Sequence, residues 1–336
     1  MKNNNKIMVL FDTEKEYAEI MGEYLKKNKT LGWDVHIYSD EEEFANNERS
    51  EDIALLLVSE KAYSERIGEI PEERLIILSE EGLLRNERVR YVDKYMRADD
   101  VLKEVLLIYL DIEGEEIKLH QKIKNKGTKL IGFYSPVHRC LQTGMAFTLG
   151  SMLAEEFRTL YLNFECYPGY ALLASTDGRK DLSDLLYFMH ENKERFILRL
   201  KTVVLKSGGL DYIPSMRTMQ NLMAVDRTEW ISLMEMLAES SEYDYIVLDL
   251  SEGVNGLFDV LKLCYRIFTV TEKDVRAESK LFNYEETLLM YECGDVKDRT
   301  VHIENPRIKR LPEDIGMYDK SELAEYIRRN IWEKCL

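Results

Sequence analysis

The stretch KLIGFYSPVHRCLQT at residues 129–143 and the stretch YDYIVLDL at residues 243–250 decide how this chain folds. Each contains a short apolar run of the kind that forms a buried strand in a parallel sheet. The first run leads through a turn into a second apolar segment, which predicts a helix at 144–156. The second run ends in Asp249, at the edge where ligands bind to parallel sheets. Together the two stretches predict an α/β domain built around parallel strands.

Segments farther along the chain extend the same alternation of strands and helices. Strands are predicted at 159–164, 208–215, 266–271 and 301–305, with helices between them. Such alternation implies a parallel sheet that has helices on both of its faces. We therefore expect one doubly wound domain over residues 129–336.

The first third of the chain shows a second set of alternating strands and helices. Its first strand is followed by a capping-box pattern and by apolar residues at helical spacing. These features predict another doubly wound parallel-sheet domain over residues 1–112. The stretch at 113–128, EGEEIKLHQKIKNKGT, has few apolar residues and is expected to be a linker. The strands of the first domain are predicted at 7–11, 33–38, 53–58, 75–78 and 89–92.

Composition and charge exclude several classes of function. The chain has 336 residues, with 46 Lys and Arg against 62 Asp and Glu, for a net charge of −16. Such a chain is repelled by nucleic-acid phosphates and by anionic lipid surfaces. Five cysteines without a C-x-x-C pair argue against a disulfide framework or a zinc site. No stretch resembles a signal peptide or a membrane span. We expect a cytoplasmic protein that binds no nucleic acid and does not insert into a membrane.

The first domain resembles the receiver domain of response regulators in its five strand–helix repeats. A receiver phosphorylates an Asp at the end of its third strand, and has acidic residues after the first strand, a hydroxyl after the fourth and a Lys after the fifth. Asp12, Ser79 and Lys94 stand at the last three of these places. Residues 57–59, LVS, offer no phosphoacceptor carboxylate. The resemblance implies an interaction module that is not phosphorylated, in which Asp12 and Lys94 are remnants or surface charges.

The second domain resembles the MinD/ParA branch of the P-loop nucleoside triphosphatases. Within that branch it is most similar to TadZ/CpaE proteins, in which a receiver-like domain precedes the ATPase domain. The resemblance covers nearly the whole chain, and it implies a P-loop fold, a cytoplasmic location and dimerisation. The motifs that carry it are YSP at 134–136, YLNFE at 161–165, GGLDYIP at 208–214, YDYIVLDLSEG at 243–253 and CYRIFTVTEKD at 264–274.

The phosphate-binding loop departs from that family. The family pattern is K-G-G-x-G-K-[ST], whereas residues 137–143 read VHRCLQT. Val137 replaces the signature Lys, and Gln142 replaces the Lys that neutralises the β- and γ-phosphates. The glycines, which let backbone N–H groups approach phosphate, are also lost. We expect no catalytic residues, no ATP hydrolysis and no required cofactor, with at most weak binding of ATP and magnesium. The glycine positions hold His138, Arg139 and Leu141.

The degenerate nucleotide site is predicted at Gln142, Thr143, Asp249 and Gly253. Thr143 stands where the magnesium-binding hydroxyl belongs, Asp249 where a Walker B carboxylate belongs, and Gly253 at the glycine of D-x-P-x-G. Asp249 has an alternative interpretation as a residue that merely ends a buried strand. Glu165 is expected to be a solvated acid at a strand end. The five histidines lack metal-ligand spacing, so no metal site is predicted.

Three functions remain open from the sequence. The TadZ/CpaE resemblance implies a non-catalytic localisation and scaffold factor for Flp (tight adherence) type IV pilus assembly, or for a related machinery at a cell pole. The first alternative is a MinD/ParA-type switch that binds ATP weakly in a non-standard manner. The second is an atypical receiver-type signalling adaptor. We also expect a homodimer that forms without nucleotide, because the loop face has become more apolar.

Overall fold

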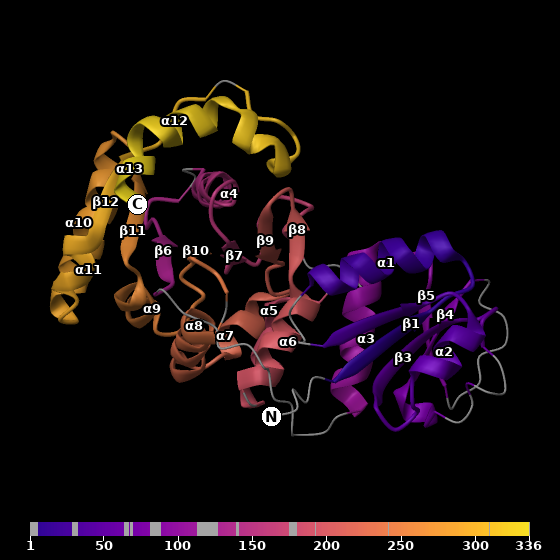
Figure 1. Cartoon of the computed structure of the whole chain (residues 1–336). Coiled ribbons are helices and arrows are strands. Elements are labelled where there is room, and N and C mark those ends of the chain that lie inside the picture. The colour runs from indigo at the N-terminus through magenta and orange to yellow at the C-terminus, as the bar shows by residue number, and fades with distance from the viewer. Residues whose placement is uncertain are drawn as a thin grey trace. The chain divides into compact units, whose positions relative to one another are not determined.

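A computed structural model places the strands of the chain in two separate sheets (Figure 1). The contacts divide the chain into two compact units. Unit 1 contains Met1–Lys122 and Glu191–Thr202, and unit 2 contains Ile123–His190 and Val203–Leu336. The structure describes residues 6–28, 33–63, 67, 70–80, 89–112, 127–138, 141–174, 180–191, 193–240, 242–308 and 310–335. Most of the predicted linker at 113–128 lies outside these residues.

The sheet of unit 1 has the strand order β2-β1-β3-β4-β5, and every pairing in it is parallel. Apolar clusters cover both of its faces, so the expectation of a doubly wound first sheet is confirmed. The strands are β1 (Ile7–Phe11), β2 (Asp34–Tyr38), β3 (Ile53–Ser59), β4 (Leu75–Ser79) and β5 (Arg90–Asp93). The helices of this part are α1 (Lys15–Lys27), α2 (Glu41–Asn47), the 3-10 turn η3 (Glu72–Arg74) and α3 (Ala98–Ile112).

One helix from the middle of the sequence also belongs to unit 1. This helix is α6 (Lys193–Val203), and Leu198 on it is fully buried in the same apolar cluster as Leu106 on α3. Arg195 Nη2 donates a hydrogen bond to the carbonyl oxygen of Leu110 over 2.9 Å. The chain therefore passes from unit 1 to unit 2, returns to unit 1 for α6, and then completes unit 2.

The sheet of unit 2 has the order β12-β11-β6-β10-β7-β9-β8. All of its pairings are parallel except that of β8 with β9, which agrees with the predicted α/β fold. The segment predicted as one strand at 208–215 contains the turn and second arm of this hairpin. The strands are β6 (Lys129–Phe133), β7 (Thr159–Asn163), β8 (Leu205–Ser207), β9 (Leu210–Ile213), β10 (Tyr245–Asp249), β11 (Arg266–Thr271) and β12 (Thr300–Glu304).

Helices surround this second sheet, and α4 (Gln142–Leu153) is the most deeply buried of those that bear on the site. It packs between the sheet and the C-terminal segments η5 and α12 (Figure 1). The other helices are α5 (Leu182–Tyr187), η4 (Phe188–His190), α7 (Met219–Ala224), α8 (Arg227–Ser240), α9 (Leu257–Leu263), α10 (Val275–Met290), α11 (Gly294–Arg299), η5 (Ile315–Lys320), α12 (Glu322–Asn330) and α13 (Trp332–Cys335).

Strand register brings the carboxyl ends of three strands of unit 2 together. Asp249 at the end of β10 pairs with Phe133 of β6 on one side and with Asn163 of β7 on the other. The chain leaves β6 here and enters α4, so the start of α4 faces the end of β10. Among the described residues, no helix has both the length and the apolar character that crossing a membrane requires.

Candidate functional site

The loop between β6 and α4 has an unusual backbone. His138 has φ 62° and Leu141 has φ 54°, so both adopt the left-handed conformation that favours glycine. These are two of the three positions at which the family pattern has glycine. The loop thus combines a glycine-type backbone at both positions with full side chains. Arg139 and Cys140 lie outside the described residues.

Gln142, the first residue of α4, is bonded to the end of β10. Its Nε2 atom donates to Asp249 Oδ1 over 2.7 Å and to the carbonyl oxygen of Leu250 over 3.0 Å. The side-chain amide therefore connects the start of the helix to the carboxylate at the sheet edge. In the family pattern, a Lys that contacts phosphate stands at this position.

Asp249 is enclosed by donors from three directions. It is 1% exposed, and its Oδ2 atom accepts a hydrogen bond from Tyr161 OH over 3.1 Å. Burial raises the pKa of this carboxyl, while hydrogen bonds from Gln142, Thr143 and Tyr161 act in the opposite direction. Gln142, Thr143 and Asp249 are thus brought together, as the sequence predicts. Asp249 does more than end a strand, because its carboxylate holds α4 and β7 to β10.

Gly253, the fourth predicted site residue, has a packing role. A Cβ atom built on it would lie 2.6 Å from Leu222 Cδ2 and 2.9 Å from Met219 Sδ, both on α7. A Cβ atom there would require the Leu222 and Met219 side chains to shift, so glycine lets the turn after β10 pack closely against α7. Gly253 does not line the cavity described next.

A cavity of about 260 Å³ opens at the start of α4. Glu165 and Glu252 contribute carboxyl groups to its lining, and no Lys or Arg belongs to the described lining. Glu165 is half-buried, which corrects the expectation of a solvated acid. Burial raises its pKa, and the neighbouring charges of Asp249 and Glu252 raise it further. The other lining residues are Tyr134, Ser135, His138, Leu141, Gln142, Thr143, Gly144, Tyr167, Pro168, Tyr170, Leu250 and Ser251.

Glu252 is held in place at the mouth of the cavity. Its Oε1 atom lies 3.1 Å from His138 Nε2 and accepts a hydrogen bond from Tyr134 OH over 3.2 Å.

Sequence reasoning missed Glu252, Tyr134 and Tyr161. No local pattern singles them out, because their roles depend on which strands pair and on the path of the turn after β10. Among the described residues, no cluster of three or more His, Cys, Asp or Glu is arranged to hold a metal.

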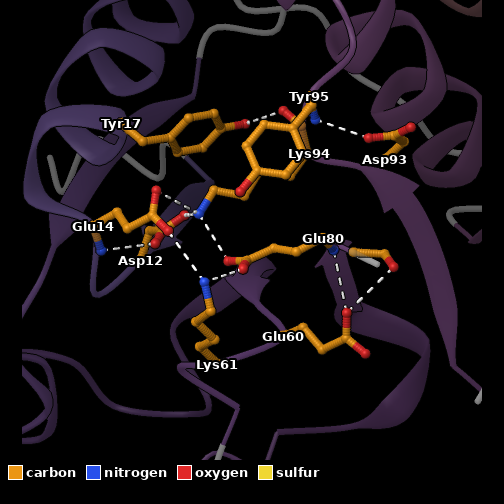
Figure 2. A network of polar contacts seen from close by, with 10 residues as sticks. Asp12, Glu14, Tyr17, Glu60, Lys61, Glu80, Asp93, Lys94 and Tyr95 are labelled. Carbon is orange, nitrogen blue, oxygen red and sulfur yellow. Dashed lines mark hydrogen bonds and ion pairs between the residues drawn. The ribbon is translucent and has the colours of Figure 1, made fainter. Parts of the chain in front are cut away.

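Unit 1 contains a second polar cluster, centred on Lys94 (Figure 2). Lys94 Nζ lies 2.8 Å from Asp12 Oδ2, 3.0 Å from Glu80 Oε1 and 3.3 Å from Glu14 Oε2. Lys61 bridges Glu14 and Glu80 at the edge of the cluster. Lys94 is 1% exposed and Asp12 is fully buried. The expectation that these two residues are surface charges is therefore wrong, because they form a buried ion pair.

A hydroxyl, and not a carboxylate, stands at the end of β3. Ser59 ends β3, and the pairing of Phe11 with Val58 puts Ser59 beside Asp12. Ser59 is fully buried. Glu60 follows it, but the Glu60 carboxylate accepts from Ser79 Oγ and from the backbone N–H of Glu80 (Figure 2). The described residues thus offer no free carboxylate there, and Lys94 occupies the space between the acids.

Burial and ion pairing act in opposite directions on the charges of this cluster. Burial lowers the pKa of Lys94, but hydrogen bonds to Asp12 and Glu80 outweigh it and leave the pKa raised. Burial raises the pKa of Glu80, but hydrogen bonds from Lys61 and Lys94 outweigh it and leave the pKa lowered. Both groups are therefore held in their charged forms.

Comparison with known proteins found matches among solved structures alone. The sequence matches no protein-family model and no curated protein. Among solved structures, a ParA family ATPase from Chlorobium tepidum TLS is 20% identical, with a TM-score of 0.43 over 58% of this chain and 81% of that one. The MinD cell division protein of Aquifex aeolicus is 18% identical, with a TM-score of 0.40 over 58% and 80%. An McdA–ATP complex of Cyanothece is 16% identical, with a TM-score of 0.41 over 59% and 80%.

Proposed function

We propose that this chain is a non-catalytic protein of the MinD/ParA type that acts as a TadZ/CpaE-like localisation and scaffold factor. Its partners are proteins of Flp type IV pilus assembly or of a related machinery at a cell pole. In this proposal the receiver-like unit 1, which includes α6, and the P-loop-like unit 2 are interaction modules. The motifs of the two domains, in that order along the chain, support it.

The hydrogen bond between Gln142 and Asp249 carries the non-catalytic part of the proposal. A P-loop needs a cation at the position of Gln142 to balance the charge of the β- and γ-phosphates, and an amide supplies none. The same amide uses an oxygen of the carboxylate that would assist magnesium. Side chains on His138 and Leu141 add bulk at positions where the family pattern has glycine, next to the phosphates. These features of the described residues support a site that does not hydrolyse ATP.

Complementation in the native host tests the scaffold function. Deletion of the gene should reduce the pili, or another polar assembly, at the cell surface, and the wild-type gene should restore them. A gene with Asp249→Asn should restore them equally well, because the carboxylate has no role in nucleotide chemistry here. Purified protein should also release no more phosphate from ATP than the Asp249→Asn variant. Turnover that disappears with Asp249→Asn would contradict the non-catalytic proposal.

A weak ATP-binding switch is the second candidate. Thr143 lines the cavity and hydrogen-bonds to Asp249, which favours this candidate because a hydroxyl and a carboxylate side by side could hold magnesium. Equilibrium titration with ATP and magnesium distinguishes the candidates. The scaffold proposal expects no saturation, whereas the switch expects saturation that Thr143→Val weakens.

A homodimer that forms without nucleotide is part of the scaffold proposal. Val137 cannot make the charged contact across bound ATP that a signature Lys makes. Large apolar side chains are instead exposed on α10, where Val275, Phe282 and Leu289 recur every seventh residue and are 81%, 62% and 51% exposed. Exposed apolar surface often marks an interface. Sedimentation should show a dimer with and without ATP. Phe282→Asp should weaken it, whereas Ile20→Asp, at an exposed site on α1, should not.

A further inference from the structure

The cavity at the start of α4 has the opposite charge character to a phosphate site. Glu165 and Glu252 belong to its lining, and Asp249 is close enough to raise the pKa of Glu165. The described lining contains no Lys or Arg to balance these acids. His138 contacts Glu252, and half of each of these two side chains is exposed at the mouth. A cation that enters from solvent can therefore reach Glu252.

The described residues that line the cavity carry a negative charge on balance. The amino terminus of α4 contributes a positive dipole equivalent to about half an elementary charge. Glu165 and Glu252 together contribute up to two negative charges. The pKa of Glu165 is raised by burial and also by Asp249 and Glu252, which shows that the acids repel one another. A further negative group, such as a triphosphate, increases this repulsion, whereas a cation relieves it.

Aromatic rings complete the walls of the cavity. Tyr134, Tyr167 and Tyr170 all line it, and Tyr134 also donates the hydrogen bond that orients Glu252. The faces of aromatic rings attract cations, and carboxylates accept charge-assisted hydrogen bonds from ammonium and guanidinium groups. The volume of about 260 Å³ is below the range of roughly 300–1,000 Å³ that is typical of pockets for drug-sized ligands. It suits one side-chain-sized group better than a whole nucleotide.

We propose that this cavity binds a guanidinium or alkylammonium group on a short aliphatic chain. Glu165 and Glu252 accept hydrogen bonds from the cation, and the tyrosines contact its aliphatic and planar parts. The group comes either from a free amine or from an Arg or Lys side chain of a protein partner. This inference rests on the proposed loss of nucleotide binding at the same site.

Calorimetric titration of the full chain tests the proposal with two cationic probes. Agmatine represents a free amine, and an acetylated, amidated tripeptide Gly-Arg-Gly represents a partner side chain. The same tripeptide with citrulline in place of Arg has nearly the same shape without the charge, and serves as the neutral control. We expect saturable binding of at least one cationic probe, weakening as salt is added, and no binding of the citrulline peptide.

Two variants and a matched control locate the binding. Glu165→Gln and Glu252→Gln keep the side-chain shape and remove the charge. Each should lower the affinity for the cationic probe about tenfold or more. Glu278→Gln, at an exposed site on α10 outside the cavity, should leave the affinity unchanged. Circular dichroism and thermal unfolding confirm that each variant is folded. If agmatine alone binds, the natural ligand is a free amine. If the Arg peptide alone binds, the ligand is a side chain of a protein partner.

Three outcomes would overturn the inference. Absence of binding by both cationic probes overturns it and leaves the scaffold proposal intact. Binding that neither Glu165→Gln nor Glu252→Gln weakens places the cation elsewhere. Saturable binding of ATP with magnesium that excludes the cationic probes would overturn both this inference and the proposed loss of nucleotide binding, and would favour the switch.

Discussion

At the scale of single residues, Lys94 shows how one buried cation organises unit 1. It is fully enclosed, and the carboxylates around it are Asp12, Glu14 and Glu80 (Figure 2). Removing one partner from a buried ion pair is costly because the other charge stays buried without compensation. The cluster therefore ties together the carboxyl ends of β1, β4 and β5.

Lys94→Met should lower the free energy of unfolding of unit 1 by about 3–5 kcal/mol. Urea denaturation followed by circular dichroism measures the change. Lys15→Met, which removes an exposed partner of Glu19, should change it by less than about 1 kcal/mol. The double variant Asp12→Asn/Lys94→Met should recover part of the loss, because it no longer buries the unpaired Asp12 charge. Equal effects of Lys94→Met and Lys15→Met would contradict the role given to the cluster.

Asp249 gives a prediction on the pH dependence of stability. Its pKa is raised in the folded protein, so the folded state binds more protons than the unfolded state above the unfolded pKa of 3.8. The contribution of this group to stability therefore falls as pH rises from that value toward the folded pKa. The free energy of unfolding of Asp249→Asn minus that of the wild type should increase over this window. Urea midpoints at several pH values test this, and a difference that is constant with pH would argue against it.

At the scale of elements, the loop between β6 and α4 has a backbone that favours glycine, although non-glycine residues occupy it. His138 and Leu141 are left-handed, and such a backbone costs a non-glycine residue roughly 1–2 kcal/mol. The tight turn persists because β6 and α4 are both anchored, the first in the sheet and the second under η5 and α12. The loop therefore stores backbone strain, because its conformation favours glycine and its residues have side chains.

Substitutions at His138 measure this strain. The variant His138→Gly should be more stable than His138→Ala by about 1 kcal/mol, because glycine adopts the left-handed conformation without a Cβ clash. The same pair at Ser279, in the exposed part of α10, should show the reverse order by a similar amount, since alanine is the better helix former. Thermal unfolding of the four variants compares the two sites. The same order of stability at both sites would show that His138 is not strained.

At the scale of the whole molecule, α6 decides where one folding unit ends and the other begins. It is encoded between α5 and β8 of unit 2, yet Leu198 on it is buried in the core of unit 1. Unit 1 therefore requires a helix that lies more than half the chain away from β1. The two units are tied by the chain on both sides of α6, so the stability of unit 1 depends on residues in the middle of the sequence.

Leu198→Ala should destabilise unit 1 by about 2–5 kcal/mol, because it leaves a cavity in a fully packed core. Hydrogen exchange measured by mass spectrometry separates the units, and protection should fall in β1 and β3. Leu261→Ala, on α9 of unit 2, should lower protection in the second sheet instead. If Leu198→Ala lowered protection only in unit 2, the assignment of α6 to unit 1 would be wrong.

Local sequence patterns were enough to predict the α/β fold and its parallel sheets. Apolar runs marked β1, β3, β6 and β10, because a strand buried on both faces must be apolar along its length. The resemblance to the P-loop pattern, rather than the apolar runs, pointed to Gln142, Thr143 and Asp249. The packing role of Gly253 could not be predicted in this way, because its closeness to Leu222 on α7 arises only when the turn after β10 packs.

The tertiary structure alone decided the contacts that join distant parts of the chain. The burial of Lys94 against Asp12, the hydrogen bond from Tyr161 to Asp249 and the placement of Glu252 at the cavity mouth all join residues tens of positions apart. The inclusion of α6 in unit 1 is of the same kind. The physical reason is that charge pairing and burial depend on distance in space, whereas hydrophobic periodicity reports only which face of an element is covered. The sequence by itself therefore determined the elements and their order, and packing determined which side chains meet.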